Sequence, residues 1–205
     1  MKLFLASEMK HPDSIKRLDG FVGGFQNKKI VYIPTAANGE FFGSWKGGES
    51  IQVAQSLGAQ FSVVELESIA YTNVLKQIGK PDILWVAGGM SGYLLYWMRR
   101  TKLDQVLPEL LQKTVYVGSS SGAMICAQTQ FSAEWYLGEP EPGASLVPGL
   151  GLVPFEIYPH FEDQQREKIE SLWEGGELYL LKNGEALTVL DGRVTVLGKE
   201  RIIRK

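Results

Sequence analysis

The sequence contains a single cysteine, Cys126, so an internal disulfide is excluded and a reducing compartment is favoured. It has no apolar run of about 18 residues, the minimum length of a membrane-spanning helix. The formal net charge is −2 and basic residues do not cluster, so the usual signs of binding to nucleic acid or an anionic membrane are missing. We therefore expect a soluble, cytoplasmic protein with neither kind of partner.

Residues that bind metals are also scarce. Besides Cys126 there are two histidines, His11 and His160, and no acidic cluster has the spacing of a metal site. The segment from Gly88 to Gly92 is too short for the glycine-rich fingerprint of a dinucleotide site. We therefore expect no metal and no cofactor. The 205 residues fit one domain, residues 1–205, present as a monomer or a homodimer.

What the sequence does contain is a regular alternation of strand and helix patterns. Near-continuous apolar runs indicate strands buried on both faces, at Lys2–Ala6, Lys29–Pro34, Phe61–Leu66, Ile83–Ala87 and Val115–Val117. Helical spacing separates them, at Ser14–Phe25, Gly48–Leu57, Thr72–Ile78, Leu94–Arg100 and Leu103–Gln112. This order predicts an α/β fold, in which a mostly parallel sheet is flanked by helices in a three-layer arrangement.

The pattern changes after Gln130. Residues 132–148 are rich in glycine, proline and glutamate without periodicity, which is typical of a surface loop. A strand is expected within Leu150–Ile157 and a helix over Asp163–Trp173. The last part is rich in strand patterns, and Asp191-Gly192 is a hairpin signal between two of them. We expect this tail to form a C-terminal antiparallel addition to the sheet.

The spacing Gly118-x-Ser120-x-Gly122 is the most informative motif. It follows the apolar run Val115–Val117 and precedes good helix formers over residues 123–128, which is the setting of a nucleophile elbow. In such an elbow the flanking glycines allow a sharp turn, and the turn exposes the serine hydroxyl. The pattern predicts Ser120 as a nucleophile.

A serine hydroxyl needs a base to take its proton, and histidine is the usual one. His11 lies between Lys10 and Pro12 in a charged loop and is interpreted as a surface residue. His160 follows a strand-like segment that ends at Pro159, where sites form in open α/β sheets. We therefore expect His160 to be the base.

Gly88 and Gly89 follow another expected strand. One interpretation is a simple tight turn. The other is that a glycine lets its N–H approach a substrate oxygen closely, forming an oxyanion hole with the N–H of Ser121.

Three segments in order resemble the peptidase E and cyanophycinase family of serine peptidases: Ile83–Gly89 followed by Leu94-Leu95, Tyr116–Ala123, and Ile157–His160. The resemblance implies a glutamine-amidotransferase-like, flavodoxin-like fold. It further implies that Ser120 is the nucleophile, that His160 is the general base, and that the N–H groups of Gly89 and Ser121 bind the oxyanion. Small peptides would be hydrolysed through an acyl-enzyme.

The sequence departs from the family in three places. Met90 stands where the family has asparagine after its glycines, so a polar group of the site is missing. The third catalytic residue, a glutamate in peptidase E, aligns with Asn183; Glu185 points to the same side if the segment is extended, so either residue or neither serves. The arginine-bearing insert that peptidase E uses for aspartyl substrates is shortened here, and Gln165 or Arg166 takes its place. We therefore do not expect aspartyl specificity.

Three functions fit these observations. The first is a serine-type hydrolase that cleaves small peptides. The second is a catalytically weak or inactive binding module on an amidotransferase-like fold, motivated by Met90 and Asn183. The third is an esterase of the α/β-hydrolase type, whose acid should lie between Ser120 and His160, where the candidates are Glu134, Glu139, Glu141 and Glu156.

Overall fold

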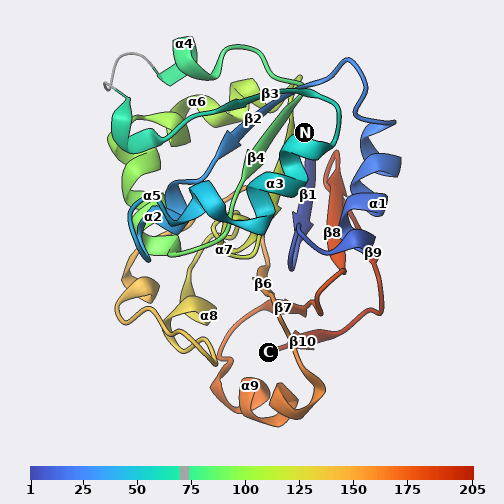
Figure 1. Ribbon diagram of the computed structural model, residues 1–205. Coiled ribbons are helices and arrows are strands. Elements are labelled where there is room, and N and C mark those ends of the chain that lie inside the picture. Colours follow the sequence, from blue (N-terminus) through green and yellow to red (C-terminus); the bar gives the residue numbers. More distant parts are fainter. Residues whose placement is uncertain (70–73) are drawn as a thin grey trace.

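The computed structural model describes residues 1–69 and 74–205. Its centre is a seven-stranded sheet in the order β3-β2-β4-β5-β1-β8-β9 (Figure 1). Strands β1 to β5 run parallel, whereas β8 pairs antiparallel with β1 and then with β9. Their bounds are β1 Lys2–Ala6, β2 Lys29–Ile33, β3 Gln60–Val63, β4 Ile83–Val86, β5 Val115–Ser119, β8 Ala186–Leu190 and β9 Arg193–Leu197. The predicted mostly parallel sheet is confirmed.

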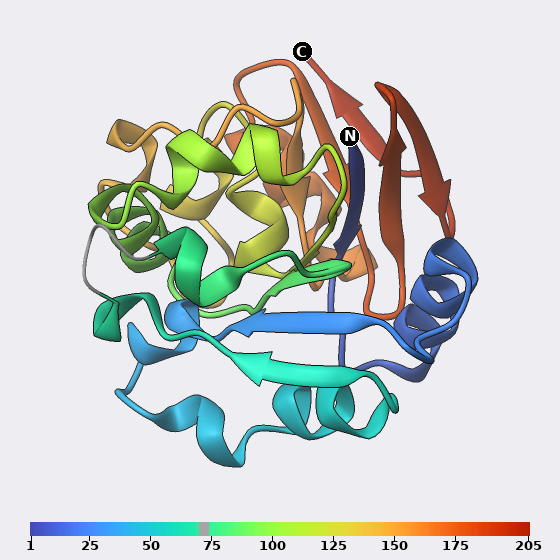
Figure 2. The ribbon, with the colours of Figure 1, turned by 90° about the horizontal axis from the view of Figure 1, so that it is seen from above.

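Helices cover both faces of this sheet, as Figure 2 shows from above. One face packs against α1 (Pro12–Val22) and α3 (Glu49–Ser56), whose Leu18 and Ile51 join the core on that side. The other face packs against three helices, α4 (Val74–Ile78), α5 (Ser91–Arg100) and α6 (Leu103–Leu110). Thr72, where the sequence predicts the start of α4, lies outside the described residues.

Burial explains why these segments are strands. Every residue of β4 is buried, and only Lys29 of β2 is not. Strands covered on both faces need apolar side chains at successive positions, and Trp85 in β4 is fully buried among them. The apolar runs in the sequence therefore identify the inner strands.

The tail differs in part from the expected addition to the sheet. Hairpin β8–β9 does extend the main sheet, and its Asp191-Gly192 turn has φ angles of 49° and 83° as such hairpins require. However, β7 (Glu177–Leu180) and β10 (Ile202–Arg204) form a second, three-stranded sheet with β6 (Glu156–Tyr158). This sheet has its own core, which it shares with α9 (Arg166–Leu172).

Residues 132–148, which were expected to form a surface loop, contain helical turns and are held by hydrogen bonds to a buried side chain. They overlap α8 (Phe131–Glu134) and contain the 3-10 helix η4 (Ala144–Leu146). The buried carboxylate of Glu156 accepts hydrogen bonds from the N–H groups of Phe131 and Ser132, at 3.0 and 2.8 Å. The hydroxyls of Thr129 and Ser132 donate to the same carboxylate. Glu156 thereby anchors this segment to β6.

Within residues 1–69 and 74–205, no helix is both long enough and apolar enough to cross a membrane.

Replacing Glu156 by glutamine should lower stability, because an amide N–H₂ would face groups that all donate hydrogen bonds. We expect Glu156→Gln to cost about 2 kcal/mol of unfolding free energy, measured by urea denaturation. Glu109→Gln, at an exposed position of α6, is the matched control and should stay within about 0.5 kcal/mol of the unaltered protein. Equal stability of the two variants would contradict the anchoring role of Glu156.

Candidate active site

Ser120 stands at a sharp turn between β5 and the one-turn helix α7 (Ser121–Met124). Its φ and ψ angles are 50° and −119°, a conformation that L-residues rarely adopt. The helix expected over residues 123–128 ends early, at Met124. The carbonyl groups of Ile125 and Cys126 instead accept hydrogen bonds from residues 150 and 152, at 2.7 and 2.8 Å. The turn has the geometry expected of a nucleophile elbow.

The two glycines of the motif are required by close backbone packing at this turn. A Cβ atom on Gly118 would lie 2.4 Å from the carbonyl oxygen of Gly122. A Cβ atom on Gly122 would lie 2.4 Å from the carbonyl oxygen of Val86 in the neighbouring strand. Both distances are too short for any side chain, so the turn demands glycine at both places.

The imidazole of His160 lies between Ser120 and Asn183. Its Nε2 is 3.0 Å from the hydroxyl oxygen of Ser120, and its Nδ1 is 2.7 Å from Oδ1 of Asn183. An amide oxygen only accepts hydrogen bonds, so Nδ1 carries the proton in this arrangement. Nε2 is then free to accept the hydroxyl proton of Ser120. From the sequence, the partner of Nδ1 could have been Asn183, Glu185 or neither. In the structure it is Asn183.

The two sheets bring these side chains together at their carboxyl ends. In the small sheet β6 and β7 are parallel, with Tyr158 opposite Leu180, so His160 and Asn183 follow neighbouring strand ends. In the main sheet β1 and β5 are neighbours, and the N–H of Ser120 donates to the carbonyl of Ala6 at 3.0 Å. The site therefore forms where the edges of the two sheets meet.

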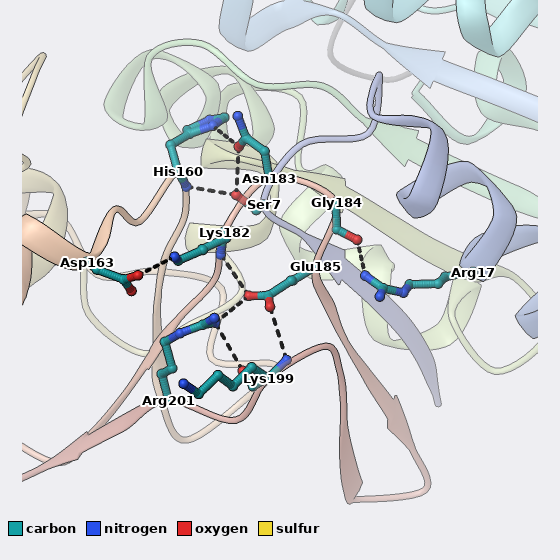
Figure 3. A network of polar contacts seen from close by, with 10 residues as sticks. All are labelled: Ser7, Arg17, His160, Asp163, Lys182, Asn183, Gly184, Glu185, Lys199 and Arg201. Carbon is teal, nitrogen blue, oxygen red and sulfur yellow. Dashed lines mark hydrogen bonds and ion pairs between the residues drawn. The ribbon is translucent and has the colours of Figure 1, made fainter.

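Ser7, which follows β1, joins both sides of this junction. Its hydroxyl is buried, donates to Oδ1 of Asn183 at 3.2 Å, and accepts from the backbone N–H of His160 at 2.7 Å (Figure 3). His160 has a φ of 52°, an uncommon value for a residue other than glycine, and the bond to Ser7 helps to hold it. Ser7 was not among the site residues expected from the sequence, although its place directly after an expected strand was a signal.

Glu185 does not share the side of the chain that Asn183 occupies. The segment is a tight turn instead of an extended strand, with the N–H of Glu185 bonded to the carbonyl of Lys182 at 3.0 Å. The Glu185 carboxylate accepts from the N–H groups of Lys182 and Lys199 and pairs with Arg201 at 2.7 Å. Figure 3 shows it turned toward Arg201, away from His160. The expected same-side placement is therefore wrong.

The four acids between Ser120 and His160 in the sequence have other positions. Glu134 accepts from the N–H of Ser145 at 2.9 Å, and Glu156 anchors α8. Glu141 accepts from the first N–H groups of α5, and Glu139 is exposed. Since Asn183 occupies the hydrogen-bonding position on His160 that an acid would need, the arrangement expected of an α/β-hydrolase esterase is not the one found.

A cavity of about 710 Å³ opens over Ser120 and His160. The four residues expected near an oxyanion, Gly88, Gly89, Met90 and Ser121, all line it. Gly89 has a φ of 135°, and a Cβ atom on it would lie 2.3 Å from the carbonyl group of Ala36, so this position also requires glycine. The side chain of Met90 is partly exposed at the cavity wall.

The remaining candidates lie outside this cavity. Gln165 accepts a hydrogen bond from the N–H of Glu162, and Arg166 pairs with Glu170 on the same helix. His11 caps α1 by accepting from the N–H of Asp13 at 3.2 Å. Among residues 1–69 and 74–205, no group of three or more His, Cys, Asp and Glu side chains is placed to hold a metal ion.

The model of peptidase family S51 matches residues 3–197. The chain belongs to peptidase family S51. An uncharacterized peptidase of Pasteurella multocida is 29% identical over 163 residues, covering 78% of this chain and 77% of the relative. Peptidase E of a Nostoc species is 26% identical over 194 residues, covering 87% of this chain and 76% of that protein.

Solved structures share the fold of this S51 chain. A Listeria monocytogenes protein solved as a candidate peptidase E superposes with a TM-score of 0.80 at 24% identity, covering 95% of this chain and 96% of that one. A peptidase from an acI-B1 actinobacterium superposes with a TM-score of 0.71 at 19% identity, covering 99% of this chain and 93% of that one. The resemblance to the peptidase E family is confirmed, and the chain is a peptidase with open specificity.

Cys126 of this S51 peptidase has no exposed surface. Burial raises the pKa of its thiol to about 12, so the thiol stays neutral at physiological pH. Because the thiolate is the reactive form of cysteine, Cys126 is inert packing near the elbow.

Removing the Ser7 hydroxyl should destabilise the S51 peptidase, because it leaves the partly buried N–H of His160 without its partner. We expect Ser7→Ala to cost about 1–3 kcal/mol in urea denaturation. Ser14 is an equally buried serine whose hydroxyl has no hydrogen-bond partner among the described residues, so Ser14→Ala is the matched control and should be as stable as the unaltered protein or more stable. If both variants were equally stable, the junction would not depend on Ser7.

Proposed function

We propose that this S51 enzyme is a serine peptidase that cleaves small peptides, with Ser120 as nucleophile and His160 as general base. The observation that supports it is the continuous hydrogen-bonded series from the Ser120 hydroxyl through both ring nitrogens of His160 to Asn183. Its position in a cavity of about 710 Å³ leaves room for a peptide a few residues long.

The reaction follows from this geometry. Nε2 of His160 takes the hydroxyl proton as the Ser120 oxygen attacks the carbonyl carbon of the peptide. The backbone N–H groups of Gly89 and Ser121 stabilise the negative oxygen that forms. His160 then passes its proton to the leaving amine, the C–N bond breaks, and an acyl-enzyme remains on Ser120. Water activated by His160 hydrolyses this ester and restores the enzyme.

Asn183 serves in this proposal as the residue that orients the base. Its Oδ1 accepts the Nδ1 proton and so keeps Nε2 as the acceptor for Ser120. As a neutral group, it adds no negative charge beside the imidazolium that forms during attack. We therefore expect catalysis slower than with a carboxylate in the same position, but with the same division of roles.

An activity-based fluorophosphonate probe should label Ser120, because it reports a serine made nucleophilic by its base. Ser120→Ala should abolish labelling, and His160→Gln should lower its rate by about 10²-fold or more. Peptide mapping of the labelled protein by mass spectrometry identifies the modified residue.

Labelling that persists in Ser120→Ala, or hydrolysis of a dipeptide panel that does not depend on His160, would contradict the proposal. A protein that binds dipeptides without labelling or turnover would instead be the inactive binding module that Met90 and Asn183 suggest.

Replacing Asn183 separates its role from that of Glu185. Asn183→Ala should reduce kcat for peptide hydrolysis by about 10-fold or more, with little change in KM, because it frees the His160 ring without altering the cavity. Glu185→Gln should lower stability through the lost Arg201 pair, and leave kcat within about 2-fold at a temperature where the protein is folded. The reverse result would assign the orienting role to Glu185.

A further inference from the structure

The cavity over Ser120 is strongly acidic. Its lining includes five glutamates against one lysine, hence a formal charge of −4: Glu8, Glu40, Glu49, Glu139, Glu141 and Lys10. These residues come from separate segments of the chain, so the charge belongs to the cavity and not to an acidic stretch of sequence. No arginine is among the described residues that line it.

The single lysine is already neutralised. Lys10 pairs with Glu49 at 3.1 Å and with Glu8 at 3.4 Å, and both carboxylates raise the pKa of its ammonium group. On this side the three charges sum to a single negative charge. Lys10 is therefore not a free cation for a substrate carboxylate.

The opposite side holds the excess charge. Glu40 follows α2 (Thr35–Asn38), while Glu139 and Glu141 belong to the segment between α8 and η4. Burial, and then the charges of Glu139 and Glu141, raise the pKa of the Glu40 carboxyl. Glu141 has hydrogen-bond donors at the start of α5, but no ion pair among the described residues involves Glu40 or Glu139.

Ser121, which lines the same cavity, also carries a polar group without a partner in the described part of the chain. The hydroxyl of Ser121 is buried, with 3% of the residue exposed, and has no hydrogen-bond partner among the described residues. A buried hydroxyl without a partner is costly, and a polar group of a bound substrate would relieve that cost. Ser121 is adjacent to Ser120, so such a group would sit close to the reacting bond.

We propose that this cavity selects short peptides that carry a lysine or arginine side chain, and that it discriminates against aspartyl peptides. The inference rests on the proposed peptidase function and names its substrate class. A cationic side chain would relieve the mutual repulsion of Glu40 and Glu139, whereas a substrate carboxylate would add to it. Gln165 and Arg166, which could otherwise meet a substrate carboxylate, lie outside the cavity and bond to Glu162 and Glu170.

Hydrolysis of a panel of dipeptide amides tests the selection. The C-terminal amide removes a carboxylate that the cavity would repel, and the panel is Lys-Ala, Ala-Lys, Arg-Ala, Gln-Ala and Asp-Ala amide. We expect at least one cationic member to exceed both the glutamine and the aspartate member by about 10-fold or more in kcat/KM. Equal rates across the panel, or a preference for the aspartate member, would overturn the inference.

Variants that neutralise single glutamates test whether the cavity wall produces the preference for cationic peptides. Glu40→Gln and Glu139→Gln should each reduce the ratio of cationic to neutral kcat/KM by about 3-fold, mainly through KM, because the lost attraction acts on binding. Glu109→Gln, on the exposed surface of α6, removes the same charge outside the cavity and should leave the ratio unchanged. An equal effect of Glu109→Gln would mean that net charge, and not the cavity wall, sets the preference.

Binding to Ser120→Ala separates this inference from the proposed chemistry. Isothermal titration with Lys-Ala amide and Asp-Ala amide should give about 10-fold tighter binding of the cationic peptide, reduced by adding Glu40→Gln. Selective binding with no turnover by the unaltered protein would refute the peptidase proposal and leave the selection standing. Turnover without any charge preference would refute the selection and leave the peptidase proposal standing.

Discussion

The register between two parallel strands of the small sheet controls the geometry of the site. Tyr158 of β6 lies opposite Leu180 of β7, and this pairing continues as hydrogen bonds between residues 158, 161 and 181. His160 and Asn183 are therefore held at a fixed separation by backbone, before any contact between their side chains. A slip of one residue would shift one of them by about 3.3 Å along the strands relative to the other, so the 2.7 Å contact depends on this pairing.

The main sheet imposes a second constraint on the same point. The elbow leaves no space for a side chain at Gly118 or Gly122, because the backbone of β4 and α7 occupies it. Ser120 is thereby held in its unusual conformation, with its N–H bonded to the end of β1. Ser7, next along β1, extends that link to His160 and Asn183. Ser7 therefore links the main sheet to the small sheet.

The sequence allowed the fold class to be predicted, and it pointed to Ser120 and His160, which the structure brings into contact, because these signals are local. Strands buried on both faces need continuous apolar runs, and an elbow needs glycines two residues from its serine. The partner of His160 stayed open because it depends on the Lys182–Glu185 turn, where Arg201 draws Glu185 away. The second sheet was missed since β7 and β8 have the same kind of apolar pattern, and only packing against α9 separates them. The acidic wall could not be foreseen from residues as distant in sequence as Glu40 and Glu139.

The neutral side chain of Asn183 and the negative charge of the cavity both affect the electrostatics around His160. In the mechanism that we propose, His160 gains a positive charge during attack on a peptide, and a carboxylate on Nδ1 would stabilise that charge directly. Asn183 offers only the dipole of its amide, so stabilisation of that charge must come from further away. The glutamates of the cavity wall supply a negative potential in a partly enclosed space, where charges act over longer distances than in open water. In the mechanism and the selection that we propose, this negative potential would draw a cationic substrate into the same cavity in which the imidazolium forms.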